Sequence, residues 1–332
     1  MGADGETADE IFRVLRYGKA DRRQQVAESY GQLMKLLESD KSISVANKVY
    51  VKAGYEVKPS FNEVAINSFR SEAEEINFTD NKAAAQTIND WVESKTNQKI
   101  KNVISPSVLD SLTGMVLINV VNFMGKWKYQ FPFTETCLMP FWITATESRE
   151  IAMMSIKKFF DYKNFADKGF SALELPYSGN GSSMLVLLPN DRIGLAALEE
   201  QLSSLDLAEV ISQMGTVEVQ VFLPKFKFEF SLDVQAELNA LGMKRMFSDS
   251  ARFPDLLDAN ETLKVSRVAH KAFIEVDEKG TKAAAVTYVI MLTSSVISLI
   301  PVIEFRADHP FVYVLLSREK SVYFIGKISN PE

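Results

Sequence analysis

Cysteine and histidine are scarce in this chain, and each shortage excludes a kind of chemistry. Cys137 is the only cysteine among 332 residues, so no disulfide can form within the chain. A single cysteine is usual for a cytosolic protein and is also allowed for a large secreted one. His270 and His309, the only histidines, lie in no HExxH motif and beside no spaced cysteines. We therefore expect no metal site and no cofactor.

The motifs that mark nucleotide binding and covalent catalysis are also missing. The sequence contains no GxGxxG, no GxxxxGK[ST] and no GxSxG. Gly125-Lys126 matches only the end of a phosphate loop, without its first glycine or its hydroxyl residue. A serine–histidine–aspartate triad is recognised by geometry and not by spacing, so inspection does not test it. We expect a protein that is not an enzyme.

Positive charge is in deficit overall. The chain has 37 lysines and arginines against 43 acidic residues, a net charge of -6, so no overall basic field attracts nucleic acid. One basic cluster lies near the N-terminus, and two interpretations of it stay open. It forms a solvated helical face, or it binds a polyanion such as a glycosaminoglycan. The cluster consists of Arg13, Arg16, Lys19, Arg22 and Arg23.

An export signal and a membrane span are not visible. The first nineteen residues are polar and contain no apolar signal core. The longest uncharged run, 283–303, has 21 residues and could just cross a bilayer. Serine and threonine interrupt it, Pro301 would break its last turn, and no aromatic or basic belt flanks both ends. We expect no membrane contact.

The chain does contain ample material for a large mixed core. It is 46% apolar with 22 phenylalanines, and a chain of this length buries about three quarters of its unfolded surface. Helical and strand patterns alternate irregularly, which indicates an α+β fold. Thr7 and Glu10 have the spacing of a capping box at the start of the first helix. Further helices are expected at 26–37, 59–69, 83–104 and 232–247, and strands at 44–51, 115–123, 183–188, 217–230, 264–276 and in a 311–328 hairpin.

Read as a strand, residues 281–292 have two different faces. One face begins with small side chains, at Thr281, Ala283 and Ala285, and the other begins with Lys282. Such a strand could enter a crowded sheet small end first. A permanently inserted strand would have the same pattern, so these residues alone do not separate the two possibilities.

The same stretch resembles the hinge and reactive-centre loop of the serpin family. Glu278-Lys-Gly-Thr281, then the charged Lys282 and three alanines, resembles the hinge of inhibitory members, and 305–315 (FRADHPFVYVL) resembles the serpin signature. The likeness extends in order over nearly the whole chain. Further matching segments are 88–92, 119–127, 223–227, 268–271 and 324–331.

The resemblance implies a single serpin domain, 1–332, with three β-sheets surrounded by helices and a hinge and reactive loop at 276–303. It implies a suicide-substrate inhibitor whose cleaved loop inserts into the main sheet. The implied hinge residues are Glu278, Gly280, Thr281, Ala283, Ala284 and Ala285. Asn119, His270 and Trp127 match positions around the sheet opening, although each could also be an ordinary core residue.

Counting seventeen residues from Glu278, as in inhibitory serpins, places the cleaved bond at Ser294–Ser295, with Leu292 and Thr293 as alternatives. No lysine or arginine lies between 283 and 305, so a trypsin-like target is not expected. A small residue before the bond fits an elastase-like protease, Leu292 fits a chymotrypsin-like one, and a papain-like cysteine protease stays open. The expected partner is a target protease in a covalent complex.

The start of the chain resembles a segment that in serpins follows two helices and the strand between them. We therefore expect an N-terminally truncated serpin. The protein would be extracellular if an upstream signal peptide exists, and cytoplasmic otherwise. Sequons at Asn77, Asn180 and Asn260 weakly suggest a secreted glycoprotein. A carrier or storage serpin, or an inactive truncated one, is the alternative function.

Overall fold

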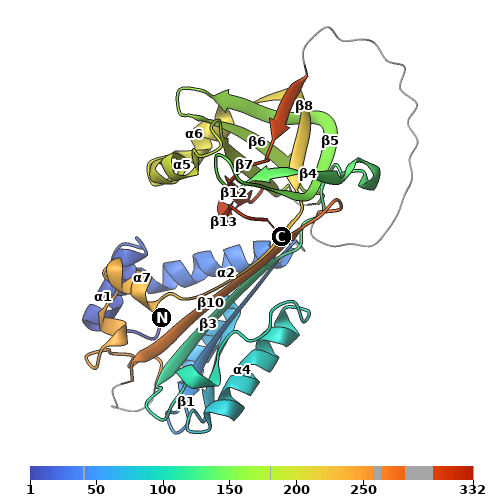
Figure 1. The fold of residues 1–332 in the computed structure, drawn as a ribbon. Helices are drawn as coiled ribbons and strands as arrows, with labels where there is room; N and C mark the ends of the chain where they lie inside the picture. Colours follow the sequence, from blue (N-terminus) through green and yellow to red (C-terminus); the bar gives the residue numbers. More distant parts are fainter. Residues whose placement is uncertain (40–41, 180, 258–262, 281–301, 332) are drawn as a thin grey trace. The chain divides into compact units, whose positions relative to one another are not determined.

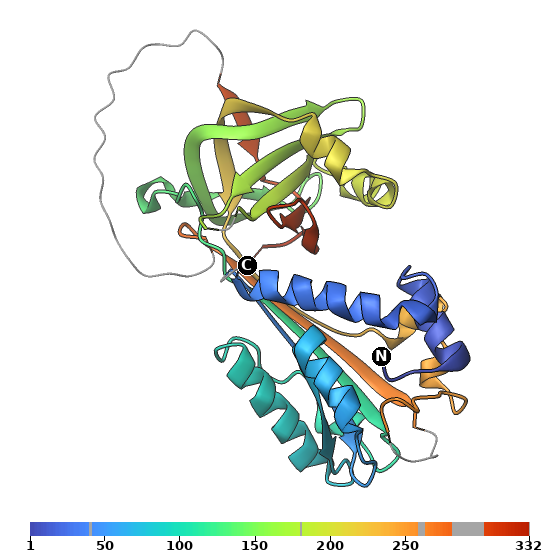
Figure 2. The same cartoon turned by 180° about the vertical axis from the view of Figure 1, so that it is seen from behind.

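The computed structural model describes residues 1–39, 42–179, 181–257, 263–280 and 302–331. They form two compact units, Met1–Phe123 with Glu229–Ile274, and Met124–Phe228 with Glu275–Glu332. Each unit has a sheet with its own helices (Figures 1 and 2). The expected α+β class is confirmed.

The first unit is built on a five-stranded sheet in the order β2-β1-β3-β10-β9. Its middle pair, β3 and β10, is parallel, with Asn119 opposite His270. The helices of this unit are α1 (Gly5–Val14), α2 (Arg23–Ser39), α3 (Pro59–Phe69), α4 (Asn81–Lys95) and α7 (Gln235–Ala240). Its strands are β1 (Ile43–Lys52), β2 (Ser71–Ile76), β3 (Met115–Phe123), β9 (Phe226–Asp233) and β10 (Val265–Val276).

Helix α4 supplies the core on one face of this sheet. The Asp80 side chain caps the helix by accepting a hydrogen bond from Ala83 N at 3.0 Å. Ile88 and Val92, one turn apart, are fully buried against Tyr50 of β1 and Val116 of β3. The helix ends at Lys95 and not at Ile104 as the apolar spacing suggests. Residues 100–104 still pack into the core, but as irregular chain.

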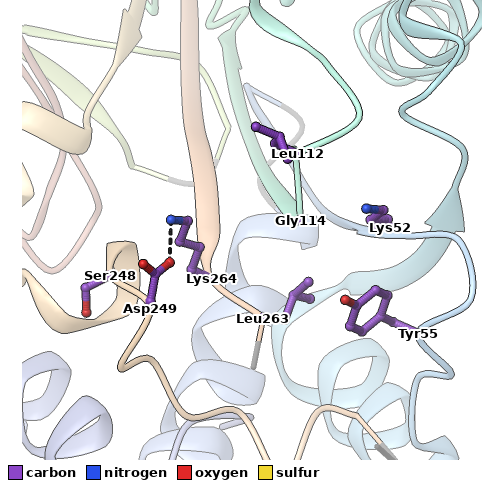
Figure 3. Close-up of a pocket in the computed structure, with 8 residues that line it drawn as sticks. All are labelled: Lys52, Tyr55, Leu112, Gly114, Ser248, Asp249, Leu263 and Lys264. Carbon is purple, nitrogen blue, oxygen red and sulfur yellow. Dashed lines mark hydrogen bonds and ion pairs between the residues drawn. The ribbon is translucent and has the colours of Figure 1, made fainter. Parts of the chain in front are cut away.

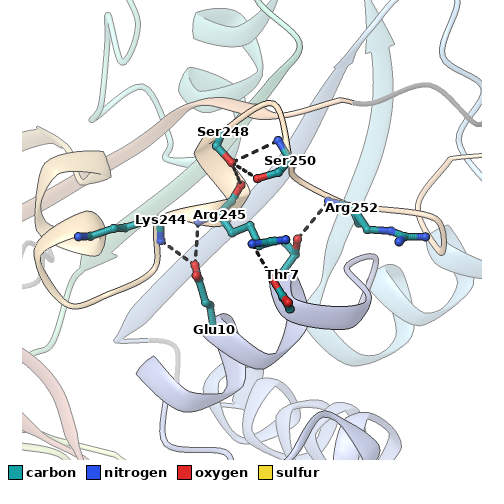
Figure 4. Close-up of polar contacts among 8 residues, drawn as sticks. Thr7, Glu10, Lys244, Arg245, Ser248, Ser250 and Arg252 are labelled. Carbon is teal, nitrogen blue, oxygen red and sulfur yellow. Dashed lines mark hydrogen bonds and ion pairs between the residues drawn. The ribbon is translucent and has the colours of Figure 1, made fainter.

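The N-terminal helix α1 is neither capped nor held in place by the contacts that the sequence predicts. Its N-cap is Asp4, so the capping box predicted at Thr7 and Glu10 is wrong. Both side chains instead bond to the segment after α7 (Figure 4). Glu10 Oε2 accepts from Lys244 N at 2.9 Å and Arg245 N at 2.7 Å, and Thr7 Oγ1 accepts from Arg252 N at 3.1 Å. Because their partners lie more than 230 residues away, local spacing could not reveal this docking.

A cavity of about 120 Å³ lies in this unit, where β1 ends and where β3 and β10 begin (Figure 3). Lys264 on its wall forms an ion pair with Asp249 at 2.6 Å, and Lys52 donates to Ser111 O at 2.8 Å. The remaining lining residues are Tyr55, Leu112, Gly114, Ser248 and Leu263. None of the predicted site residues that the structure describes lines this cavity.

The second unit contains an eight-stranded sheet, in which seven strands follow the order β11-β8-β5-β6-β7-β12-β13 and β4 pairs with β5. Strand β5 (Ser148–Phe165) is long enough to pair with β4 and β8 and, near its end, also with β6. β5 thereby joins the strands β4, β8 and β11 to the strands β6, β7, β12 and β13 in one sheet. The other strands are β4 (Cys137–Trp142), β6 (Phe170–Pro176), β7 (Ser183–Pro189), β8 (Gly215–Pro224), β11 (Ile303–Arg306), β12 (Phe311–Leu316) and β13 (Val322–Ile328).

Two short helices, α5 (Leu195–Leu202) and α6 (Leu207–Ser212), cover part of this sheet. Leu198 and Val210 pack there with buried leucines and valines of β7 and β12. The single strand expected at 217–230 is two strands, β8 and β9, with Lys225 between them.

Candidate functional site

The first hinge residues form an ordered turn at the end of β10. Gly280 N donates to Asp277 O at 3.1 Å, and Asp277 N donates to Gly280 O at 3.0 Å. The Asp277 carboxylate accepts a further bond from Lys279 N at 2.9 Å. The predicted hinge therefore begins from a fixed position.

Gly280 is the one residue of this turn that tolerates no side chain. Its φ of +107° is left-handed, where L-residues are strained. A Cβ there would lie 2.6 Å from both Lys126 Cα and Trp127 N, and closer still to Gly125 O. The sequence predicts that a glycine is needed here for backbone freedom. The close approach of residues 125–127 is a second reason why only glycine fits.

Gly280 also makes two antiparallel bridges, one to Asp277 and one to Lys126. Asp277 directly follows β10, and Lys126 follows the end of β3 by three residues. The backbone of Gly280 thus pairs with the chain that continues each of the two middle strands.

Glu278 anchors the turn from the side. Its side chain is only 3% exposed, accepts from Thr136 Oγ1 at 2.9 Å, and lies 3.0 Å from Lys225 Nζ. Burial alone raises the pKa of this carboxyl, but its backbone hydrogen bond, Lys225 and Thr136 outweigh that effect and lower the pKa. Glu278 is therefore held as a buried, paired carboxylate.

Trp127 bonds to the backbone of the same turn. Its Nε1 donates to Asp277 O at 2.9 Å and its backbone N donates to Lys279 O at 3.0 Å. The indole is 2% exposed and stacks on Tyr177 with ring centroids 4.5 Å apart. Trp127 is at once a core aromatic and a direct support of the turn at which the predicted hinge begins.

Asn119 and His270 are brought together in the first unit, on facing positions of β3 and β10. His270 Nδ1 lies 2.6 Å from Asn119 Oδ1, and Asn119 Nδ2 donates to Asn47 Oδ1 of β1 at 2.6 Å. The His270 ring is partly buried, and burial lowers its pKa, so the neutral form is favoured. This polar ladder crosses three adjacent strands. Asn47 is a member that sequence reasoning missed.

Several predicted residues lie outside the part of the chain that the structure describes. They are Thr281, Ala283, Ala284, Ala285, Leu292, Thr293, Ser294, Ser295 and the sequon residues Asn180 and Asn260. The third sequon residue, Asn77, is exposed, and its Oδ1 accepts from Thr79 N at 3.0 Å.

The basic cluster is only partly available to an anion. Arg23 forms ion pairs with Asp4 at 3.0 Å and with Asp255 at 2.6 Å. Arg13, Arg16 and Arg22 are exposed. Contact with a polyanion therefore stays a prediction that rests on these three arginines.

Across the described residues, no helix has the length and apolar content needed to cross a bilayer.

We compared the chain with protein-family models, with known proteins and with solved structures. The family model described as "Serpin (serine protease inhibitor)" matches residues 1–331. The chain is 34% identical over 334 aligned residues to serine protease inhibitor 42Dd of Drosophila melanogaster, covering all of this chain and 87% of that protein. It is 32% identical over 339 residues to the leukocyte elastase inhibitor of Bos taurus, covering 100% and 89%.

A solved structure of cleaved Serpin 42Da superposes with a TM-score of 0.88 at 35% identity, covering 100% of this chain and 87% of that one. The family model, the sequence identity over the whole of this chain and the similarity of fold agree with one another. The chain belongs to the serpin family.

Proposed function

We propose that this protein inhibits a protease by offering residues 281–301 as a substrate and inserting the freed hinge between β3 and β10. One observation carries the proposal, namely the pair of antiparallel bridges that Gly280 makes to Lys126 and Asp277. These bridges support the proposal because they pair the Gly280 backbone with the chain that follows each of the two strands. The small residues at Thr281, Ala283 and Ala285 would follow along one face of the inserted strand.

The chemistry of the proposal is an interrupted proteolysis. The nucleophile of the protease attacks the carbonyl carbon of Ser294, the Ser294–Ser295 amide breaks, and Ser295 leaves with a new amino group. The hinge, joined to the protease nucleophile through the acyl group of Ser294, enters the sheet before water can hydrolyse this ester or thioester. The new strand would gain the backbone hydrogen bonds of both neighbours.

The residues before the predicted bond support some target classes over others. The stretch 283–303 contains no lysine or arginine, and Ser294 is small. These features favour an elastase-like serine protease. Leu292 would suit a chymotrypsin-like protease if the bond is displaced by two residues, and a papain-like cysteine protease is a third candidate.

The test is to incubate the chain with one protease of each class and to separate the products by gel electrophoresis in SDS. We expect a complex of the summed masses that survives SDS with one class and no complex with trypsin. A protease whose nucleophile is replaced by alanine is the control and should give no such band. If every protease only cleaves the chain, the protein is a non-inhibitory serpin and the proposal is wrong.

A further inference from the structure

We propose that Asn77 is a modification site that accepts an N-linked glycan in the lumen of the secretory pathway. Asn77-Phe-Thr79 has the residue types and the spacing that this modification requires, with no proline in the middle. The site lies in the first unit. The inference does not depend on protease inhibition.

The sequon forms a surface turn between two regular elements. Strand β2 ends at Ile76 and helix α4 begins at Asn81. Phe78 is 1% exposed and belongs to the same core cluster as Ile88 of α4, whereas Asn77 and Thr79 on either side of it are exposed. The buried ring therefore fixes the turn, and both polar side chains of the sequon are held at the surface.

The turn leaves free the two side-chain groups that define the sequon. Asn77 Oδ1 accepts from Thr79 N at 3.0 Å, which closes an Asx turn. Asn77 Nδ2 and Thr79 Oγ1 form no hydrogen bond within the part of the chain that the structure describes. The fold thus uses the Asn77 oxygen and the Thr79 backbone, and it makes no use of the amide nitrogen or the hydroxyl.

The closing hydrogen bond of this turn is entirely local. Because it joins residues only two apart, the same turn can form before the rest of the chain has folded. The acceptor amide is then presented in the same way to a transferase in the unfolded chain and to solvent in the folded one.

The expected reaction is a glycosyl transfer from a lipid diphosphate-linked oligosaccharide. Asn77 Nδ2 forms a bond to the anomeric carbon of the first sugar, the bond from that carbon to the diphosphate breaks, and Nδ2 loses one proton. Glu75 and Asp80, which flank the turn, are also exposed. A bulky polar glycan attached here would extend into solvent from a polar surface and would displace no core residue.

Import into microsomes tests the site directly. The full chain is placed behind a cleavable signal peptide and translated with microsomes, in a background where Asn180→Gln and Asn260→Gln leave one sequon. Chains that are protected from added protease are compared by gel electrophoresis before and after treatment with an amidase that removes N-linked glycans. We expect one slower band, abolished by the amidase, for this background and for the same background with Thr79→Ser.

Thr79→Ala is the decisive variant, because it removes the sequon and keeps the backbone N–H that bonds to Asn77. It should lose the slower band completely. The site is disproved if protected chains of the background carry no glycan, or if the slower band persists in Thr79→Ala.

The unglycosylated protein supplies the control for folding. Thr79→Ala should unfold within about 2 °C of wild type, because its hydroxyl is exposed and not bonded. A larger fall would mean that the hydroxyl serves the fold, and the inference that the turn leaves this sequon free would be wrong.

Discussion

Replacing Thr281 with arginine should turn the protein from an inhibitor into a substrate. Thr281 directly follows Gly280, and we propose it as the first side chain to enter the sheet. Burying an unpaired guanidinium costs several kcal/mol, and each 1.4 kcal/mol on the barrier slows insertion about ten-fold. Hydrolysis of the acyl-enzyme would then be faster than insertion of the hinge. We expect the yield of complex stable to SDS, measured by densitometry, to fall at least about ten-fold, with cleaved chain in its place.

Lys282→Arg is the matched control for this experiment. It places the same guanidinium one residue further on, where strand alternation puts the side chain on the opposite, outer face. Its yield of complex should equal that of wild type. Full yield from Thr281→Arg would mean that this side chain is not buried during inhibition, and the assignment of the hinge would be wrong.

Replacing Gly280 with valine should destabilise the intact protein strongly. The change forces a β-branched residue into a φ of +107° and places a Cβ 2.6 Å from the backbone at Lys126 and Trp127. Backbone strain of this kind costs about 1–3 kcal/mol, and the steric overlap adds to it. At about 2–4 °C per kcal/mol, we expect the thermal midpoint to fall by roughly 5 °C or more.

Gly215→Val provides the comparison. A Cβ on Gly215, at the exposed start of β8, meets no atom within 4 Å. This variant should unfold within about 1 °C of wild type. An unchanged midpoint for Gly280→Val would show that the turn at 277–280 is not held against Lys126 and Trp127 as the structure has it.

Local pattern predicted some elements to the residue and others poorly. Helix Pro59–Phe69 and strand Met115–Phe123 match the expected bounds. Pro59 starts the helix, and β3 is a dense apolar run, so both signals are local. The long helix expected at 83–104 is wrong after Lys95. Asn97 and Gln98 adopt positive φ there, while Ile100 and Ile104 stay buried through tertiary packing.

The candidate site was only partly visible in the sequence. Glu278 and Gly280 stand out through their resemblance to an inhibitory hinge. The groups that hold Glu278 do not, because Lys225 and Thr136 lie 53 and 142 residues away from it. Asn47 was missed for the same reason. Its place opposite Asn119 is fixed by the register of β1 with β3, which no local spacing encodes.

The thermal midpoint of the chain before and after one cut near Ser294 measures loop insertion most directly. An inserted hinge of about a dozen residues gains hydrogen bonds to both neighbours, each contributing about 0.5–1.5 kcal/mol. We expect the cleaved protein to unfold at least about 10 °C higher than the intact one. A midpoint that is unchanged or lower after cleavage would contradict insertion between β3 and β10.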